Sequence, residues 1–173
     1  MPEKKPMALS ALKFLGAILA LTAASYGVLI FTPLESTLGA YTAYGTQAVL
    51  SSLGESTTLT LQEFPHLVGE RFDAELIALC FGTLEIALWT GIVFATANRT
   101  LRRRAQGFLA GLAAFLVFNP VRIALTLKIF DASKPFASFA AHDVLFRLTL
   151  AALFVVAYAV WYAWPEQRKT RRK

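Results

Sequence analysis

The stretch Glu75-Leu-Ile-Ala-Leu-Cys80-Phe-Gly-Thr-Leu-Glu85 contains the only cysteine of the 173-residue chain. It opens an apolar run that continues to residue 97 and is interrupted only by Glu85. About 20 helical residues, at about 1.5 Å each, cross the apolar layer of a bilayer. The stretch therefore predicts a membrane-spanning helix over 75–97, with Cys80 about five residues, or roughly 8 Å, from its outer end.

The rest of the chain has the composition of a multi-pass membrane protein. Hydrophobic residues make up 56% of it and charged residues only 16%, and the apolar residues fall into blocks as long as a bilayer crossing. We predict an all-α membrane protein, a single domain over residues 1–173, with about four transmembrane helices over 14–31, 75–97, 107–130 and 142–164. The net charge of +6 does not indicate a nucleic-acid partner, because the basic residues cluster at the ends of the apolar blocks.

The region over residues 32–75 differs from the spans, and we expect it to be extracytoplasmic. Residues 34–54 are long enough to cross a membrane but are diluted by Ser, Thr, Gly and Gln. They predict an interfacial or re-entrant helix, with a fifth span as the alternative. Polar and apolar residues alternate in Thr58-Leu-Thr-Leu61 and Phe72-Asp-Ala-Glu-Leu76. This alternation predicts a short hairpin-like segment or two extended segments.

Basic residues set the expected orientation. The segment Asn98-Arg-Thr-Leu-Arg-Arg-Arg104 contains four arginines, the first 13 residues contain three lysines, and the segment 166–173 is basic. With four spans, all three basic segments fall on one side, which is the cytoplasmic side by the positive-inside rule. A fifth span would place the N-terminal lysines outside. Cys80 is then expected near the outer face of the membrane.

Three more residues are predicted to share the outer layer with Cys80. Arg122 lies about eight residues, roughly 12 Å, inside the third span, His142 opens the fourth span, and Arg147 follows about one and a half turns later. Arginines within spans usually face the bundle interior or a wet cavity. A guanidinium near a thiol favours the thiolate and opposes the effect of burial on its pKa. The pattern indicates a nucleophile, Cys80, with Arg122, His142 and Arg147 converging on it.

A purely structural interpretation of these residues remains open. A single cysteine in an apolar helix is commonly an inert, small apolar residue. Arg122 can pair with Glu85, and Arg147 can pair with Asp143 on the same helix face, so the charges would only hold helices together. The pair Asn119-Pro120 predicts a kink in the third span. The alternative to an enzyme is a non-catalytic small membrane transporter or assembly subunit with buried structural charges.

No metal or organic cofactor is expected from the sequence. The one cysteine and the two histidines are far apart and lack the spacing of metal ligands. A membrane thiol oxidoreductase is disfavoured, because Cys80 has no second cysteine in a CxxC arrangement.

Three motifs follow one another along the chain: Cys80-Phe-Gly82, Asn119-Pro-Val-Arg122-Ile123 and Ala141-His142-Asp-Val-Leu-Phe-Arg147. In order and spacing they resemble the exosortase/archaeosortase family of membrane transpeptidases over about residues 70–164, and the short archaeosortase-like members in particular. The resemblance implies a cysteine-dependent sorting peptidase or transpeptidase in the cytoplasmic (cell) membrane, with its active site facing outward. It would cleave the C-terminal sorting signal of exported proteins, a short motif followed by a transmembrane helix and a basic tail, through a Cys thioester.

Carried onto this chain, the resemblance makes Cys80 the nucleophile and Arg122 the family arginine. The third family position is His in exosortases and can be Arg in archaeosortases, so either His142 or Arg147 can fill it. Phe81 departs from the small or polar residue that often follows the family cysteine. The implied partners are exported proteins that carry the signal, and membrane lipid. The acceptor of the new C-terminus is left open, and the extended segments near 58–76 are candidates to bind the recognition motif as an added strand.

Overall fold

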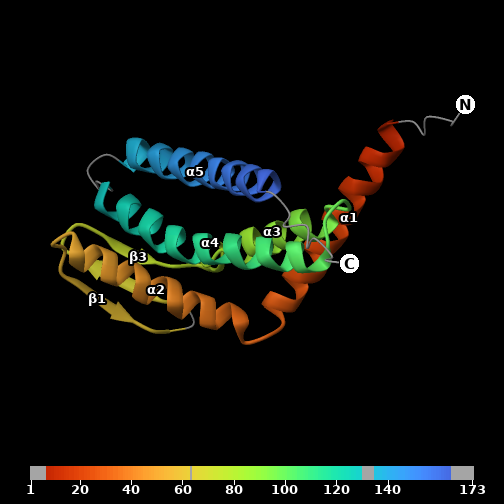
Figure 1. Cartoon of the computed structure of the whole chain (residues 1–173). Coiled ribbons are helices and arrows are strands. Elements are labelled where there is room, and N and C mark those ends of the chain that lie inside the picture. Colours follow the sequence, from red (N-terminus) through yellow and green to blue (C-terminus); the bar gives the residue numbers. More distant parts are fainter. Residues whose placement is uncertain (1–6, 63, 130–134, 165–173) are drawn as a thin grey trace, which may run out of the picture.

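The computed structural model describes residues 7–62, 64–129 and 135–164; over 7–9 and 135–147 it describes the course of the helices but not the side chains. Helices dominate this part of the chain (Figure 1). The elements, in chain order, are α1 (Met7–Ile30), α2 (Leu34–Ser52), β1 (Thr57–Thr60), β2 (His66–Gly69), β3 (Asp73–Glu75), the 3-10 turn η1 (Ala78–Cys80), α3 (Thr83–Ala95), α4 (Leu101–Ile129) and α5 (Pro135–Ala163).

Two of the described helices are long and apolar enough to cross a membrane. They are the part Ser10–Ile30 of α1, and α4 (Leu101–Ile129). Two shorter apolar helices, Thr83–Ala95 and Leu148–Ala163, accompany them. The prediction of a mostly helical chain with membrane-type helices is therefore confirmed at this level, while the number of crossings stays a prediction.

The helices are arranged with α4 at the centre. Figure 1 shows α2 and α5 running alongside α4, α1 and α3 crossing at one end, and the strands at the other end. At the α1–α3 crossing, a Cβ on Gly91 would overlap the Thr22 hydroxyl and lie 2.8 Å from the Ile18 carbonyl oxygen. A glycine at this position lets the two backbones approach closely, which is a common device where apolar helices pack.

The helix predicted over 34–54 is confirmed as α2, which packs against the second half of α4. Gly45 of α2 meets Pro120 of α4, where an added Cβ would lie 2.9 Å from the proline ring. The buried residues of α2 recur every three or four positions, which is the spacing of one helix face. They are Gly39, Thr42, Ala43, Thr46 and Leu50.

The predicted hairpin-like segment is confirmed, with three strands in the order β1-β2-β3, all antiparallel. The register aligns Leu59, Leu67 and Ala74 across the sheet, and Leu67 is fully buried. This face covers a core that α2 and α4 share with the sheet. The prediction missed β2, because Pro65 and Gly69, which flank or end its four residues, are typical of loops.

The helix predicted over 75–97 is wrong at its start. The chain forms β3 and the turn Ala78–Cys80 before α3 begins at Thr83. Gly82 separates turn from helix with φ +80, and a Cβ there would overlap the ring of Phe115. Only glycine adopts this left-handed conformation without strain, so the helix cannot extend upstream of it. Cys80 therefore lies in a turn before α3 and not inside a helix.

The helices that correspond to the predicted spans 107–130 and 142–164 are longer than predicted. α4 begins at Leu101 and takes in Arg102 to Arg104, and α5 begins at Pro135. Charged residues limit the apolar stretch but not the helix, because arginine is a good helix former. α4 also continues through Pro120 as one helix.

Candidate functional site

Cys80 ends the short turn that connects β3 to α3. Its N–H donates to the carbonyl oxygen of Ile77 at 2.7 Å, and its partly buried side chain packs against the core beneath the sheet. The next residue, Phe81, is buried and contacts Gly39, where an added Cβ would lie 2.8 Å from the ring. Phe81 therefore anchors the turn in the core between α2 and α4, which explains a large apolar residue beside the cysteine.

Asn119 ties this turn to α4. Its Nδ2 donates to the carbonyl oxygen of Cys80 at 2.9 Å, and its Oδ1 accepts from Nη2 of Arg122 at 2.7 Å. Asn119 is 1% exposed and Arg122 is 4% exposed. The two residues are three apart on α4, so they share one helix face. A single amide thus fixes the backbone of Cys80 and the guanidinium of Arg122 relative to each other.

Electrostatics at the thiol follow from this packing. Burial raises the pKa of the Cys80 thiol above its ordinary value, and the nearby positive charge of Arg122 lowers it by less. The charge of Glu85 adds a small further increase to this pKa. The thiol is therefore protonated at neutral pH, and the thiolate is the reactive form. The predicted effect of Arg122 is present in direction, but it does not by itself produce a thiolate.

Glu85 lies in the first turn of α3, near enough to Arg122 for their charges to interact. This agrees with the attraction expected between the two residues. Glu85 is also among the residues around an apolar cleft between α3, α4 and α5, together with Trp89, Phe115 and Phe154.

His142 and Arg147 both belong to α5, but their side chains lie outside the described residues. Successive residues of a helix are about 100° apart around its axis, so positions five apart differ by about 140°. Only one of the two can therefore face a given neighbour on α4. Of the four predicted site residues, the structure brings Cys80 and Arg122 together, and the roles of all four stay predictions.

Sequence reasoning missed the position of Asn119. It placed Asn119 in a predicted kink and in one of the three motifs but gave its side chain no partner, whereas the amide bridges two residues 39 positions apart. The available signal was a strongly polar side chain in an apolar helix, which must find hydrogen-bond partners when buried.

Among the described residues, no group of three or more His, Cys, Asp or Glu side chains is placed to hold a metal ion.

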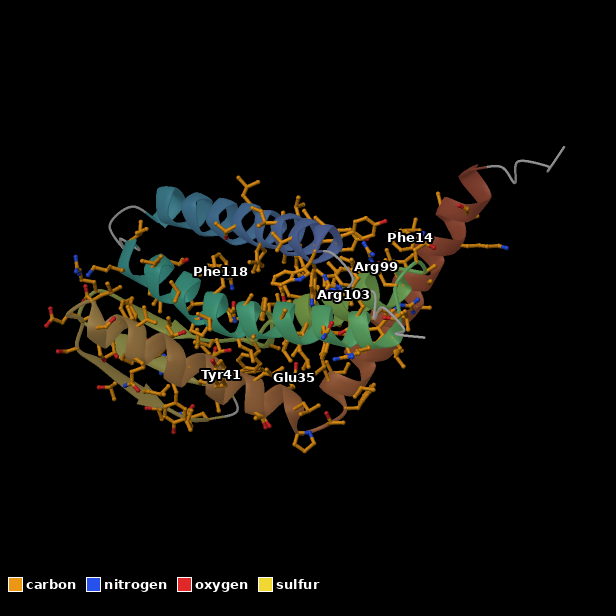
Figure 2. The ribbon with its side chains drawn as sticks, viewed as in Figure 1. Phe14, Glu35, Tyr41, Arg99, Arg103 and Phe118 are labelled. Atoms are coloured by element: carbon orange, nitrogen blue, oxygen red, sulfur yellow. The ribbon has the colours of Figure 1, made fainter. Side chains whose placement is uncertain are left out.

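The arginine cluster lies at the other end of α4, where it binds the end of α5. Nη2 of Arg103 donates to the carbonyl oxygens of Trp161 at 2.9 Å and Trp164 at 3.1 Å, and Nη2 of Arg99 donates to that of Tyr162 at 2.6 Å. Figure 2 shows both arginines at this junction. The last carbonyls of a helix have no partner within it, so these arginines cap α5.

Comparison with known proteins adds no relative. No protein-family model, no curated protein and no solved structure matches this chain significantly.

Proposed function

We propose that this chain is a membrane-embedded, cysteine-dependent sorting peptidase or transpeptidase of the exosortase/archaeosortase type. The proposal is supported above all by the contact between two of the three sequence motifs. Asn119 hydrogen-bonds both the Cys80 carbonyl and the Arg122 guanidinium, so the motifs form one local arrangement. An inert apolar cysteine needs no buried cation beside it, and burying a charge is costly. A nucleophile whose reaction develops negative charge does use such a cation.

The proposed topology has four crossings: Ser10–Ile30, α3, α4 and the later part of α5. The arginines between α3 and α4 then mark the cytoplasmic face, and α2 with the sheet lies on the outer side. The 13 residues of α3 rise about 20 Å, which is less than the roughly 30 Å of the apolar layer. About 10 Å of the layer then remains beyond the outer end of α3, so Cys80, just before α3, would lie in the outer leaflet.

In the proposed first step, the sulfur of Cys80 attacks the carbonyl carbon of a peptide bond next to the recognition motif. An S–C bond forms, the C–N bond breaks, and the leaving amine carries away a proton. Because the pKa of the thiol is raised, a base must take the thiol proton as the sulfur attacks. His142 is the proposed base, which then protonates the leaving amine. Arg147, the alternative third residue, keeps its proton and would stabilise the developing negative charge instead. Arg122 stabilises the negative charge that moves from the sulfur to the carbonyl oxygen.

The second step releases the product. Water or an amine attacks the thioester carbon, the C–S bond breaks, and the Cys80 sulfur regains a proton. With water the enzyme is a protease, and with an amine it is a transpeptidase that attaches the new C-terminus to the acceptor. Neither step draws on a cofactor.

Processing of a reporter protein tests the proposal. The reporter is an exported protein fused to a C-terminal segment from the same genome that has a short motif, an apolar stretch and basic residues. We expect wild-type enzyme to yield a shortened product, and Cys80→Ala and Cys80→Ser to yield none while reaching the membrane at wild-type levels. A hydroxylamine-sensitive adduct of enzyme and reporter would identify the thioester.

The opposite result is equally specific. If Cys80→Ala processes the reporter at the wild-type rate, the sulfur is not the nucleophile. If neither Cys80→Ala nor Cys80→Ser has a phenotype while Arg122→Ala removes the protein from the membrane, the chain is a structural or transport subunit with buried charges.

A further inference from the structure

β3 is the edge of the sheet that leads directly to Cys80. Two hydrogen bonds bracket its pairing with β2: the N–H of Gly69 donates to the carbonyl of Phe72 at 2.9 Å, and the N–H of Leu76 donates to that of Pro65 at 2.8 Å. In an antiparallel pair, residues that exchange hydrogen bonds alternate with residues that do not. Phe72, Ala74 and Leu76 therefore direct their backbone groups toward β2.

The residues between them direct their backbone groups the other way. Asp73 and Glu75 have their N–H and C=O groups on the free side of β3, and Ile77 continues the extended chain with φ -75 and ψ 166. In the part of the chain that the structure describes, no hydrogen bond to the backbone groups of Asp73 or Glu75 is formed. The Asp73 side chain is 71% exposed, so this edge is open.

The opposite edge of the sheet is not equivalent. On β1, the outward carbonyl of Thr57 accepts a hydrogen bond from Nε2 of Gln47 at 3.1 Å. Gln47 belongs to α2, so a side chain of the neighbouring helix already occupies the start of that edge. An unpaired edge strand is a ready template for pairing with another chain. β3 is therefore the open edge of the sheet, and it is also the edge that continues into the site.

We infer that this edge binds the recognition segment of the substrate as an added strand, parallel to β3. The inference rests on the proposed function. The direction follows because β3 leads through Cys80 into α3, while the substrate's segment leads in the same sense into its own transmembrane helix. Five extended residues over 73–77 span about 13 Å from first to last, and the turn adds about 6 Å. The substrate peptide bond that follows the paired segment would therefore lie near Cys80.

The side chains along this edge specify the kind of peptide. Asp73 and Glu75 are exposed and give this edge two carboxylates, of which that of Asp73 also contacts Nε2 of His66 on β2. Ile77 and Leu79, nearer to Cys80, are 44% and 63% exposed apolar residues. Opposite charges on neighbouring strands stabilise a pair, and like charges destabilise it. The fitting segment therefore has basic or neutral residues first and apolar residues last. Acidic residues opposite the two carboxylates are selected against.

Hydrogen exchange of the full chain in detergent micelles tests the inference. The probe is the synthetic peptide acetyl-Thr-Lys-Val-Lys-Val-Leu-amide, with a copy N-methylated at alternate residues as its control. We expect the probe to slow exchange of the amides of Asp73, Glu75 and Ile77 about tenfold, an effect of one hydrogen bond each. The amide of Ala74, which already faces β2, should not change, and the N-methylated peptide should protect none of them.

Other outcomes overturn the inference. Protection of Thr57 and Leu59 would place the peptide on β1, and unchanged exchange at saturating probe would remove the edge as a binding site. Protection that grows with protein concentration without any probe would mean that a second copy of the chain occupies the edge.

Glu75→Pro separates the backbone edge from its side chains. Proline removes the outward N–H but no bond to β2, and proline is tolerated on edge strands. We expect the Kd of the probe to increase about tenfold, more than in Glu75→Ala. The matched control Thr57→Pro, at the first residue of β1, should leave the Kd unchanged. An alkylation rate of Cys80 equal to that of wild type shows that the fold is intact in each variant. If Glu75→Pro is intact by this measure and its Kd for the probe is unchanged, the inference is refuted.

Thiol capture tests the parallel direction. The probe carries a terminal cysteine as a mixed disulfide with thionitrobenzoate; the Cys80 thiolate attacks, a new S–S bond to the peptide forms, and thionitrobenzoate leaves. A C-terminal cysteine should be captured about tenfold faster than an N-terminal one, and the reverse preference refutes parallel pairing. These results are independent of reporter processing. If the probe peptide does not protect the amides of β3 while wild-type enzyme still processes the reporter, only the proposed binding edge is refuted. If Cys80→Ala processes the reporter, only the proposed peptidase mechanism is refuted.

Discussion

The side-chain amide of Asn119 donates a hydrogen bond to the backbone carbonyl of Cys80 at 2.9 Å, across 39 residues of sequence. The bond holds the turn that carries the thiol against the middle of the central helix. Its donor is fixed in turn, because the same amide accepts from Arg122. Position and charge at Cys80 therefore depend on one buried side chain.

Replacing Asn119 should disturb both stability and reactivity. Asn119→Ala leaves the Cys80 carbonyl without its donor and removes one acceptor of Arg122, so we expect the free energy of unfolding to fall by about 1–3 kcal/mol. Reporter processing should fall with it. The measurement is thermal or denaturant unfolding in micelles, with the exposed Asn98→Ala as the control, expected within about 0.5 kcal/mol of wild type. Equal effects of the two substitutions would mean that the hydrogen bonds of Asn119 do not stabilise the fold.

The reactivity of Cys80 should increase steeply with pH. Because burial raises its pKa, the thiol is protonated at pH 7, and the thiolate fraction increases about tenfold per pH unit below the pKa. We expect the iodoacetamide alkylation rate to climb from pH 7 to 9 without a plateau. As Cys80 is the only cysteine, the whole signal comes from this site, and a plateau below pH 8 would contradict the raised pKa.

Removing the charge of Arg122 should slow the same reaction. Arg122 lowers the pKa of Cys80, so Arg122→Gln raises that pKa further and leaves less thiolate at pH 8. Arg122→Lys keeps a positive charge and should restore part of the rate, while the exposed Arg102→Gln should have no effect. Faster alkylation in Arg122→Gln, with the fold intact by circular dichroism, would show that the guanidinium shields the sulfur instead of favouring its ionisation.

Two glycines with the same backbone angle separate strain from overlap. Gly82 has φ +80 and Gly54 has φ +81, but only at Gly82 would a Cβ overlap a neighbour, the ring of Phe115; at Gly54 nothing lies within 4 Å. Gly54→Ala should cost about 1 kcal/mol of stability from the backbone alone. Gly82→Ala should cost about 1–3 kcal/mol more, the range for overpacking. Denaturant unfolding gives the comparison, and equal costs would mean that Phe115 moves aside freely.

The arginines after α3 should contribute to stability as well as to orientation. Arg103→Ala removes the donor to the Trp161 and Trp164 carbonyls, so we expect a loss of about 1–2 kcal/mol and faster hydrogen exchange at the end of α5. Arg102→Ala removes the same charge from an exposed side chain and should change neither. If both variants keep wild-type stability and exchange, the cluster acts only as a topology signal.

The sequence was most informative where one pattern decides the structure alone. Apolar blocks predicted the helices, and alternation over 56–76 predicted extended chain. The predicted start of the helix over 75–97 was wrong, because the apolar residues 76–80 continue into α3 without a change of periodicity. The one local mark of the boundary is Gly82, and its role depends on Phe115, 33 positions later. A contact between distant elements is not visible in the composition of either.

The site shows the same division. Cys80 and Arg122 were identifiable because a single thiol and a charge inside apolar helices are unusual in type. The direction of the pKa shift of Cys80 could not be predicted from the sequence, since it depends on the balance between burial and the charge of Arg122. In the structure, burial dominates. The bridge by Asn119 depends on the register between two elements, which no local motif specifies.

The central helix α4 runs from Leu101 to Ile129 as one helix, with the α5-binding Arg103 near one end and Asn119 beyond its middle. In a continuous helix, the number of residues between two positions fixes both the angle and the distance between them. One residue inserted between these two positions would turn the amide by about 100° and shift it by about 1.5 Å, away from the Cys80 carbonyl. The length of the segment between the cap and the bridge is thus itself a structural constraint, and even the deletion of a whole turn should break the bridge, because it shifts the amide by about 5.4 Å.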